Sequence, residues 1–369
     1  MRVLIVGAGV IGTSIAYHLA VRGADVMVLE RNGVACAASG KSGGFLALDW
    51  CDGTPLMPLA RRSFALHAEL AASLQGDWGY RRMTTYAGEM GRSHASQHDA
   101  APGWIAPDVA IAGQIGSTAT TAQVHPAAFT IGMMRAAEAL GAELRPGEAE
   151  GLLRRNGAVA GVVVGGEALE ADAVVIAMGP WSILAAQWLK LPPVFGLKGH
   201  SLIFQTGATI PPEALFLEYA EPGGPMLTPE VFPRADGTTY VCGISSESSL
   251  PIDPDFVSPD DGAIDRLHAL CARMSPILAQ APVLASQACF RPVTADGLPL
   301  IGAVPGARGA YVATGHSVWG ILNAPATGEA MAELILDGAA RSVDLSPFNP
   351  ARLAALDPDR VSITRRLGR

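Results

Sequence analysis

Three glycines and one glutamate near the N-terminus have the types and spacing of a dinucleotide-binding site. Gly7, Gly9 and Gly12 form the pattern G-x-G-x-x-G, and Glu30 follows 18 residues after the last of them. In this pattern the first glycine makes a tight turn, the second lets the backbone approach a pyrophosphate, and the third lets a helix pack closely on a strand. The acid accepts hydrogen bonds from the ribose and disfavours a 2′-phosphate. These residues predict a bound FAD or NAD.

The elements that must position this motif follow from hydrophobic periodicity. Val3 to Val6 is an apolar run typical of a buried strand, Ile15 and Leu19 lie on one face of a predicted helix, and Val26 to Leu29 form a second strand that ends at Glu30. The order is that of a βαβ unit. The amino end of its helix offers unpaired N–H groups and partial positive charge to phosphates.

A loop rich in glycine and serine follows the acid. On sequence alone it is either a surface loop or a main-chain cradle for a phosphate or a flat ring. Its position directly after the ribose acid favours the cradle, which in a flavin site runs from the pyrophosphate towards the isoalloxazine. The expected contacts are Ala38, Ser39, Gly40, Ser42, Gly43, Gly44 and Phe45.

Composition excludes several other classes of function. The net charge is −8 and no Lys or Arg cluster exceeds a dipeptide, which argues against nucleic acid and anionic membranes as partners. No apolar run approaches the roughly 20 residues of a membrane helix. The five cysteines are scattered without C-x-x-C spacing, which indicates reduced thiols. We therefore expect a cytoplasmic protein without an integral membrane segment.

The layout along the chain predicts an α/β (α+β) protein with a discontinuous Rossmann-like domain. Helices are expected over 56–74, 126–140, 262–274 and 324–336, and residues 75–125 are expected to be turn-rich with short extended pieces. The predicted FAD-binding domain comprises 1–75, 125–187 and 288–345, the inserted substrate domain with a mixed or antiparallel sheet comprises 76–124 and 188–287, and 346–369 form a C-terminal tail. Such a discontinuity favours a flavoprotein over a simple NAD dehydrogenase.

Two later segments are more specific. Residues 291–299 read Arg-Pro-x-x-x-Asp-Gly-x-Pro, and residues 315–328 read Gly-His…Gly-Ile…Ala-Pro-Ala-Thr-Gly. With the corner at 177–181 and the N-terminal fingerprint, the chain resembles the FAD-dependent family of D-amino-acid oxidase, glycine oxidase, sarcosine oxidase and D-amino-acid dehydrogenases. Within that family it looks closest to the glycine-oxidase-like members.

The resemblance implies oxidation of a C–N bond by hydride transfer to flavin N5, followed by hydrolysis of the imine. It gives Arg291 the role of holding the substrate carboxylate, which suits a planar guanidinium that stays charged. Tyr219 and Tyr240 are candidates to complete that clamp. Val318 stands where glycine oxidases carry a further basic residue, so a second carboxylate anchor is not evident.

The resemblance also implies further flavin contacts. A helix beginning near Asn323 or Ala324 should aim its amino end at flavin N1–C2=O. Cys289 matches the cysteine that some sarcosine oxidases join to the flavin, whereas the glycine-oxidase-like motif favours noncovalent FAD. Lys198 is either near the flavin or in a solvated turn. The other expected cofactor contacts are Val10, Ile11, Arg31, Ala149, Ala177, Gly179, Trp181, Arg291, Gly315, His316, Gly320, Ile321 and Leu322.

We therefore predict an FAD-dependent oxidoreductase that acts on a small amino acid or secondary amine, with oxygen or another compound as electron acceptor. Two alternatives remain: a dehydrogenase of amino or 2-hydroxy acids linked to a quinone or another acceptor, and an FAD-binding assembly or regulatory protein without turnover. No metal site is predicted, because His94 and His98, at helical i, i+4 spacing, lack a third ligand and are interpreted as surface residues.

Overall fold

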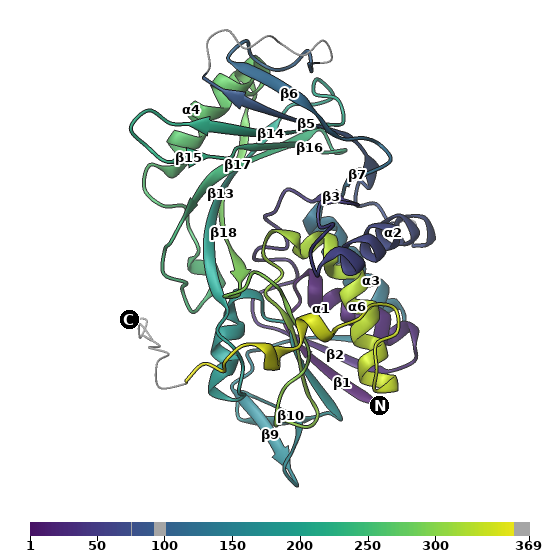
Figure 1. Ribbon diagram of the computed structural model, residues 1–369. Helices are drawn as coiled ribbons and strands as arrows, with labels where there is room; N and C mark the ends of the chain where they lie inside the picture. The colour runs from purple at the N-terminus through teal and green to yellow at the C-terminus, as the bar shows by residue number, and fades with distance from the viewer. Residues whose placement is uncertain (75, 92–100, 358–369) are drawn as a thin grey trace.

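The computed structural model describes residues 1–74, 76–91 and 101–357, and two large sheets dominate it (Figure 1). His94 and His98 lie outside the described residues. In the lower sheet the strand order is β19 (Leu300–Ala303), β20 (Ala310–Thr314), β12 (Ala173–Ile176), β1 (Arg2–Val6), β2 (Asp25–Glu30) and β8 (Glu143–Pro146). All neighbours are parallel except β19 and β20. Apart from Arg2, the central strands β1 and β12 are fully buried, as their continuous apolar runs predict.

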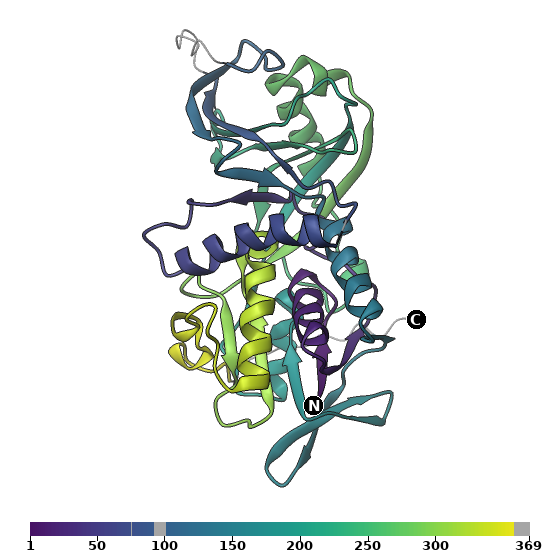
Figure 2. The ribbon, with the colours of Figure 1, turned by 90° about the vertical axis from the view of Figure 1, so that its right-hand side faces the viewer.

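Helices cover one face of this sheet and a small meander covers the other (Figure 2). α1 (Val10–Val21) and α6 (Gly320–Asp337) lie on the sheet and pack on each other. α3 (Pro126–Ala139) packs on α1, and α2 (Met57–Ser73) packs on α6. The meander consists of β9 (Gly151–Arg155), β10 (Ala158–Val164) and β11 (Glu167–Glu170). The 3₁₀ helices are η1 (Gly179–Gln187), η2 (Pro254–Phe256), η3 (Ser317–Trp319), η4 (Ser346–Phe348) and η5 (Pro350–Arg352).

The upper sheet is mixed. Its order is β18 (Val283–Val293), β13 (Phe195–Gln205), β17 (Thr238–Ser246), β16 (Glu230–Pro233), β14 (Glu213–Ala220), β5 (Thr84–Met90) and β6 (Val109–Gly116), with β15 (Met226–Leu227) on β14. β14 and β5 are parallel and the other pairs antiparallel. One face packs on α4 (Ala263–Met274) and α5 (Pro276–Gln280). A short third sheet joins β3 (Phe45–Ala47), β7 (Thr121–Gln123) and β4 (Arg81–Arg82).

Two sequence expectations differ from this architecture. The segment 76–124 holds two regular strands, β5 and β6, where only short extended pieces were expected. The two strands pair with each other, and β5 also pairs with β14, a partner far away in sequence. In addition, residues 288–293 belong to β18 of the upper sheet. The long strands β13 and β18 run from that sheet towards the lower one (Figure 1).

Helix α6 begins at Gly320, earlier than the predicted start near Ala324, although Pro325 lies inside it. Proline has no N–H to donate to the carbonyl of Ile321. Instead, His67 of α2 contacts the carbonyl oxygens of Ile321 and Leu322 through Nε2, at 2.9 and 3.2 Å. The N–H of Ala326 donates to the Ser63 hydroxyl at 3.0 Å. Partners on α2 thus satisfy the backbone groups that the proline disturbs, and the helix continues through it.

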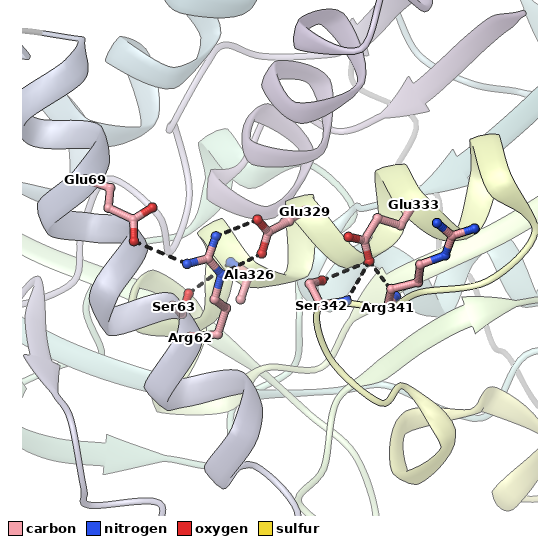
Figure 3. Close-up of polar contacts among 8 residues, drawn as sticks. All are labelled: Arg62, Ser63, Glu69, Ala326, Glu329, Glu333, Arg341 and Ser342. Atoms are coloured by element: carbon pink, nitrogen blue, oxygen red, sulfur yellow. Dashed lines mark hydrogen bonds and ion pairs between the residues drawn. The ribbon is translucent and has the colours of Figure 1, made fainter.

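Charged side chains strengthen the same contact between α2 and α6. Figure 3 shows Arg62 of α2 donating two hydrogen bonds to Glu329 of α6, at 2.8 and 2.7 Å, and a third to Glu69. Two parallel N–H···O bonds from one guanidinium fix the relative geometry of both groups. Farther along α6, Glu333 accepts bonds from the N–H groups of Arg341 and Ser342 and ties the following loop to the helix.

Within the described residues no helix is long and apolar enough to cross a membrane.

Candidate active site

A cavity of about 810 Å³ lies where the carboxyl ends of the parallel strands face the mixed sheet. Its lining at one end includes Gly9, Glu30 and Ser39, and at the other Gly43, Arg291 and Gly320. Ligands of parallel α/β sheets bind at this edge of the strands, and the volume lies within the usual range for cofactor pockets.

The glycine motif and Glu30 form the first end of the cavity. A Cβ on Gly12 would overlap the carbonyl oxygen of Gly7, which explains the close approach of α1 to β1. The N–H of Val10, in the first turn of α1, donates to the Ser39 hydroxyl at 2.9 Å. The Glu30 carboxylate accepts N–H groups of Ala8 at 2.7 Å and Asn32 at 2.9 Å. The oxygen that accepts from Asn32 also accepts the N–H of Gly33 at 3.3 Å. The other oxygen, which accepts from Ala8, keeps a further lone pair for a ligand.

The segment 251–253, far away in sequence, closes this end of the cavity. Arg31 donates to the carbonyl of Ile252 at 2.6 Å, and the Asn32 amide donates to Asp253 at 2.9 Å. The Trp181 indole N–H donates to the carbonyl of Pro251 at 2.7 Å. Ile252 therefore borders the cavity through contacts that no local sequence pattern indicates.

The glycine-rich loop passes between the two sheets. A Cβ on Gly43 would overlap the Phe232 ring, and one on Gly44, where φ is +76°, would overlap the carbonyl oxygen of Val124. Arg234 donates to the carbonyl of Ser42 at 2.9 Å, while the Ser42 hydroxyl is buried without a partner in the described part of the chain. The loop can therefore lie against a flat ligand and offers it an unused hydroxyl.

The amino end of α6 faces the opposite side of the cavity. Gly320 and Ile321 line it, and the preceding Trp319 has an indole that only donates, so its side chain cannot cap the first N–H groups. The His316 imidazole contacts the Thr327 hydroxyl at 3.1 Å, and its burial lowers its pKa to about 3. His316 is therefore neutral, and the free helix end carries the local positive potential.

The wall opposite α6 is one face of the mixed sheet, and Arg291 extends across it. From β18 its guanidinium passes over Gly199 of β13, where an added Cβ would lie 3.2 Å from Arg291 Nη2. It makes a long contact of 3.4 Å to the Ser245 hydroxyl of β17. Within the described residues Arg291 forms no ion pair, so its charge is available to a ligand of the cavity.

Glu230 lies on the same wall, and sequence reasoning missed it. It is half-buried, its carboxylate borders the cavity, and it accepts a hydrogen bond from the Cys242 thiol at 3.5 Å. Burial raises the pKa of Glu230, while Arg291 and the thiol oppose that shift. Glu230 and Phe232 alternate along β16, a signal that could have placed both on one face.

Aromatic side chains close the cavity beside Glu230, and sequence reasoning missed all but one of them. Phe216 is the centre of this aromatic cluster, with ring centroids 5.0 Å from Phe45, 4.8 Å from Trp50 and 5.3 Å from Phe232. Trp319 extends it, 6.5 Å from Trp50. The cluster excludes water and offers an apolar surface to a ligand.

The structure separates the two candidate tyrosines. Tyr240 borders the cavity on β17, with Phe232 stacked beside it. Tyr219 does not, because it faces the core under α4 and its hydroxyl accepts a hydrogen bond from Arg273 at 2.5 Å. The clamp role for Tyr219 was therefore wrong. Successive residues of a strand point to opposite faces of the sheet, and sequence alone did not resolve which face each tyrosine takes.

Lys198 and Cys289 also have definite positions. Lys198 is buried on the other face of β13 from Gly199 and pairs with Asp260 at 2.5 Å, so it lies neither at the cavity nor in a solvated turn. That contact lowers the pKa of Asp260 to about 2. Cys289 borders the cavity two residues from Arg291, and burial raises the pKa of its thiol, which disfavours the thiolate.

Most predicted cofactor residues border the cavity, and three do not. Gly12 is buried between α1 and β1, Gly40 packs against the carbonyl of Ala35, and Leu322 points into the helical core. The residues that do border it are Gly7, Gly9, Val10, Ile11, Glu30, Arg31, Ala38, Ser39, Ser42, Gly43, Gly44, Phe45, Ala149, Ala177, Gly179, Trp181, Arg291, Gly315, His316, Gly320 and Ile321.

The arrangement fits FAD. Backbone N–H groups at the start of α1 and the Glu30 carboxylate suit the AMP half, and the glycine loop and the free end of α6 suit a flat ring. The described residues contain no group of three His, Cys, Asp or Glu side chains able to hold a metal ion.

Comparison with known proteins agrees with this fit. The model of the DAO family, described as FAD dependent oxidoreductase, matches residues 2–334. An oxidoreductase of Schizosaccharomyces pombe is 30% identical over 95% of this chain and 97% of its own length. Glycine oxidase of Pseudomonas aeruginosa is 28% identical, over 95% and 98%. The crystal structure of glycine oxidase from Geobacillus kaustophilus has a TM-score of 0.79, with 26% identity over 95% and 99%. The chain therefore belongs to the DAO family of FAD-dependent oxidoreductases.

Proposed function

We propose that this protein oxidises the C–N bond of a small amino acid or secondary amine, with Arg291 binding the carboxylate of that substrate. The observation that carries the proposal is the guanidinium of Arg291. It lies on the cavity wall opposite the free end of α6, and no acidic side chain of the described residues forms an ion pair with it. A guanidinium in that setting recognises a planar anion through paired hydrogen bonds.

His316 and Tyr240 supply no proton transfer to this redox site near neutral pH. His316 is neutral and the Tyr240 hydroxyl is held protonated, since burial raises its pKa well above the usual value. Bound FAD supplies the hydride acceptor, N5 of its ring, and water hydrolyses the imine that the substrate becomes. The work of the protein is then to anchor the carboxylate, orient the C–H bond and exclude water.

The test is anaerobic reduction of the FAD-bound enzyme by glycine, sarcosine, proline derivatives and both series of amino acids. We expect at least one amino acid or amine to bleach the flavin. An enzyme that retains FAD and is reduced by none of them would refute the proposal, and reduction only by a 2-hydroxy acid would replace it. Reoxidation by oxygen, compared with a quinone analogue, then identifies the electron acceptor.

Arg291→Met tests the anchoring residue directly. Loss of a charged, paired hydrogen bond to the carboxylate costs about 3 kcal/mol, so KM should rise on the order of 100-fold. Arg291→Lys is the matched control, because it keeps the charge without the planar fork. Its KM should lie between that of the wild type and that of Arg291→Met.

A further inference from the structure

Glu230 is a carboxylate that no positively charged side chain of the described residues contacts. Within the described residues it forms no ion pair, and its hydrogen-bond donor is a thiol, a weak one. A carboxylate that is partly withdrawn from water is costly unless it is paired or protonated. Its unpaired side borders the cavity, so the missing partner belongs to the ligand.

The positions of Glu230 and Arg291 suit the two ends of an amino acid. Arg291 reaches β17 at Ser245 and Glu230 reaches the same strand at Cys242. The register of β13 with β17 shifts between these two positions, which brings both contacts to one face. The two groups are also near enough for the charge of Arg291 to act on the pKa of Glu230. A ligand between them can therefore place a carboxylate at Arg291 and the neighbouring ammonium at Glu230.

We propose that Glu230 binds the ammonium group of the substrate and accepts one of its protons, while the aromatic cluster beside it receives an apolar substituent. This inference rests on the proposed function, because it concerns the same substrate in the same cavity.

The proton step is balanced. Alkylammonium groups keep their proton up to about pH 10, and an amine must be neutral before its carbon can give up a hydride. One N–H bond of the ammonium breaks, an O–H bond forms on Glu230, and the nitrogen keeps the electron pair. Nothing is oxidised or reduced in this step.

The other charged and titratable groups of this wall agree with that role. Arg291 approaches from β18 and favours the carboxylate form of Glu230, while burial favours the protonated form. Cys242 and Tyr240 of β17 and Cys289 of β18 are held neutral by burial. Glu230 is thus the group of this wall that can exchange a proton with a bound amine near neutral pH.

The neighbours of Glu230 indicate the class of substrate. Phe216 stands directly opposite Glu230 in the register of β14 with β16, and the aromatic cluster continues from it to Trp50. A substituent on the carbon or nitrogen next to the ammonium therefore contacts aromatic rings. We infer a preference for amino acids with an apolar or aromatic side chain or N-substituent over glycine.

The first test is the pH dependence of anaerobic flavin reduction in Glu230→Gln. At pH 7 we expect the rate of flavin reduction in this variant to fall about 100-fold, the usual contribution of a general base. The rate should recover as the pH approaches the pKa of the substrate ammonium group. Glu218→Gln, which removes an exposed charge on β14, should behave as the wild type at every pH. A Glu230→Gln profile equal to that of the wild type would overturn the proposal.

The second test needs neither turnover nor a variant. α-Methylphenylalanine lacks the hydrogen that oxidation removes, and 2-methyl-3-phenylpropanoate is its counterpart without the amine. We expect the wild-type enzyme to bind the first at least 10-fold more tightly, measured by perturbation of the flavin spectrum. Equal affinities would overturn the role of Glu230. Because neither compound is oxidised, this result is separate from failure of the reduction panel, which would count against the proposed function instead.

Discussion

The interruption of α6 by Pro325 gives a prediction whose magnitude follows from the structure. His67→Ala removes the group that contacts the Ile321 and Leu322 carbonyls. It also removes a fully buried ring whose centroid lies 4.7 Å from that of Phe129. An unsatisfied buried carbonyl costs about 1–3 kcal/mol and the cavity about 2–3 kcal/mol. We expect the free energy of unfolding to fall by about 4 kcal/mol.

The cost of the unsatisfied carbonyl depends on Pro325, so it can be separated from the cost of the cavity. In a Pro325→Ala background, residue 325 has an N–H that can donate to the Ile321 carbonyl in the ordinary helical pattern. His67→Ala should then cost about 1.5 kcal/mol less, and this difference is the coupling energy of the double-mutant cycle. The cavity cost appears in both backgrounds and cancels.

The assay is guanidinium unfolding of the four proteins at one fixed excess of FAD, followed by far-UV circular dichroism and flavin fluorescence. Pro276→Ala is the control, because Pro276 begins α5 and its substitution gives no N–H to a carbonyl of α6. Its effect on the free energy of unfolding should therefore add to that of His67→Ala. A coupling between His67 and Pro325 below about 0.3 kcal/mol would refute the reasoning.

Three further predictions concern glycines and acid. Gly44→Ala should cost about 3 kcal/mol and weaken FAD retention, measured by thermal unfolding and by flavin release, because the positive φ and the overlap with Val124 both oppose a side chain. Gly199→Ala should raise the KM of a carboxylate substrate roughly 10-fold with little change in kcat, since it displaces the Arg291 guanidinium. Stability should fall as the pH drops below about 6.5, because burial lowers the pKa of His18 and His67 to about 4 and that of His316 to about 3. The unfolded chain then binds protons that the folded chain excludes, which denaturation midpoints from pH 7 to pH 4 would measure.

Each of these has its own control. Gly53 has φ +75° but open space around it, so Gly53→Ala measures the backbone cost alone. If Gly44→Ala cost no more than Gly53→Ala, the overlap with the Val124 carbonyl would not contribute, against our reasoning. Gly113→Ala, also in open space on β6, should leave KM unchanged, and so would Gly199→Ala if Arg291 did not bind substrate. The acid dependence should weaken in His67→Ala, and an unchanged pH slope would contradict its assignment to this histidine.

The sequence alone determined the parts of the fold whose contacts are local. The strand, glycine turn, helix and acid of the first 30 residues lie within one βαβ unit, so their spacing carries the geometry. The bounds of α2, α3 and α4 followed from helical periodicity in the same way. The position of Arg291 at the cavity was predicted through the motif around it.

Only the tertiary structure decided which residues of the mixed sheet line the cavity together with Arg291. Glu230, Phe216 and Gly199 come from three strands that pair out of chain order, and the face each presents depends on register and on a local shift in it. A slip of one residue would turn every side chain of a strand to the opposite face. Tyr240 borders the cavity while Tyr219 lies in the core for this reason, and α6 extends through Pro325 because α2, far away in sequence, satisfies its backbone.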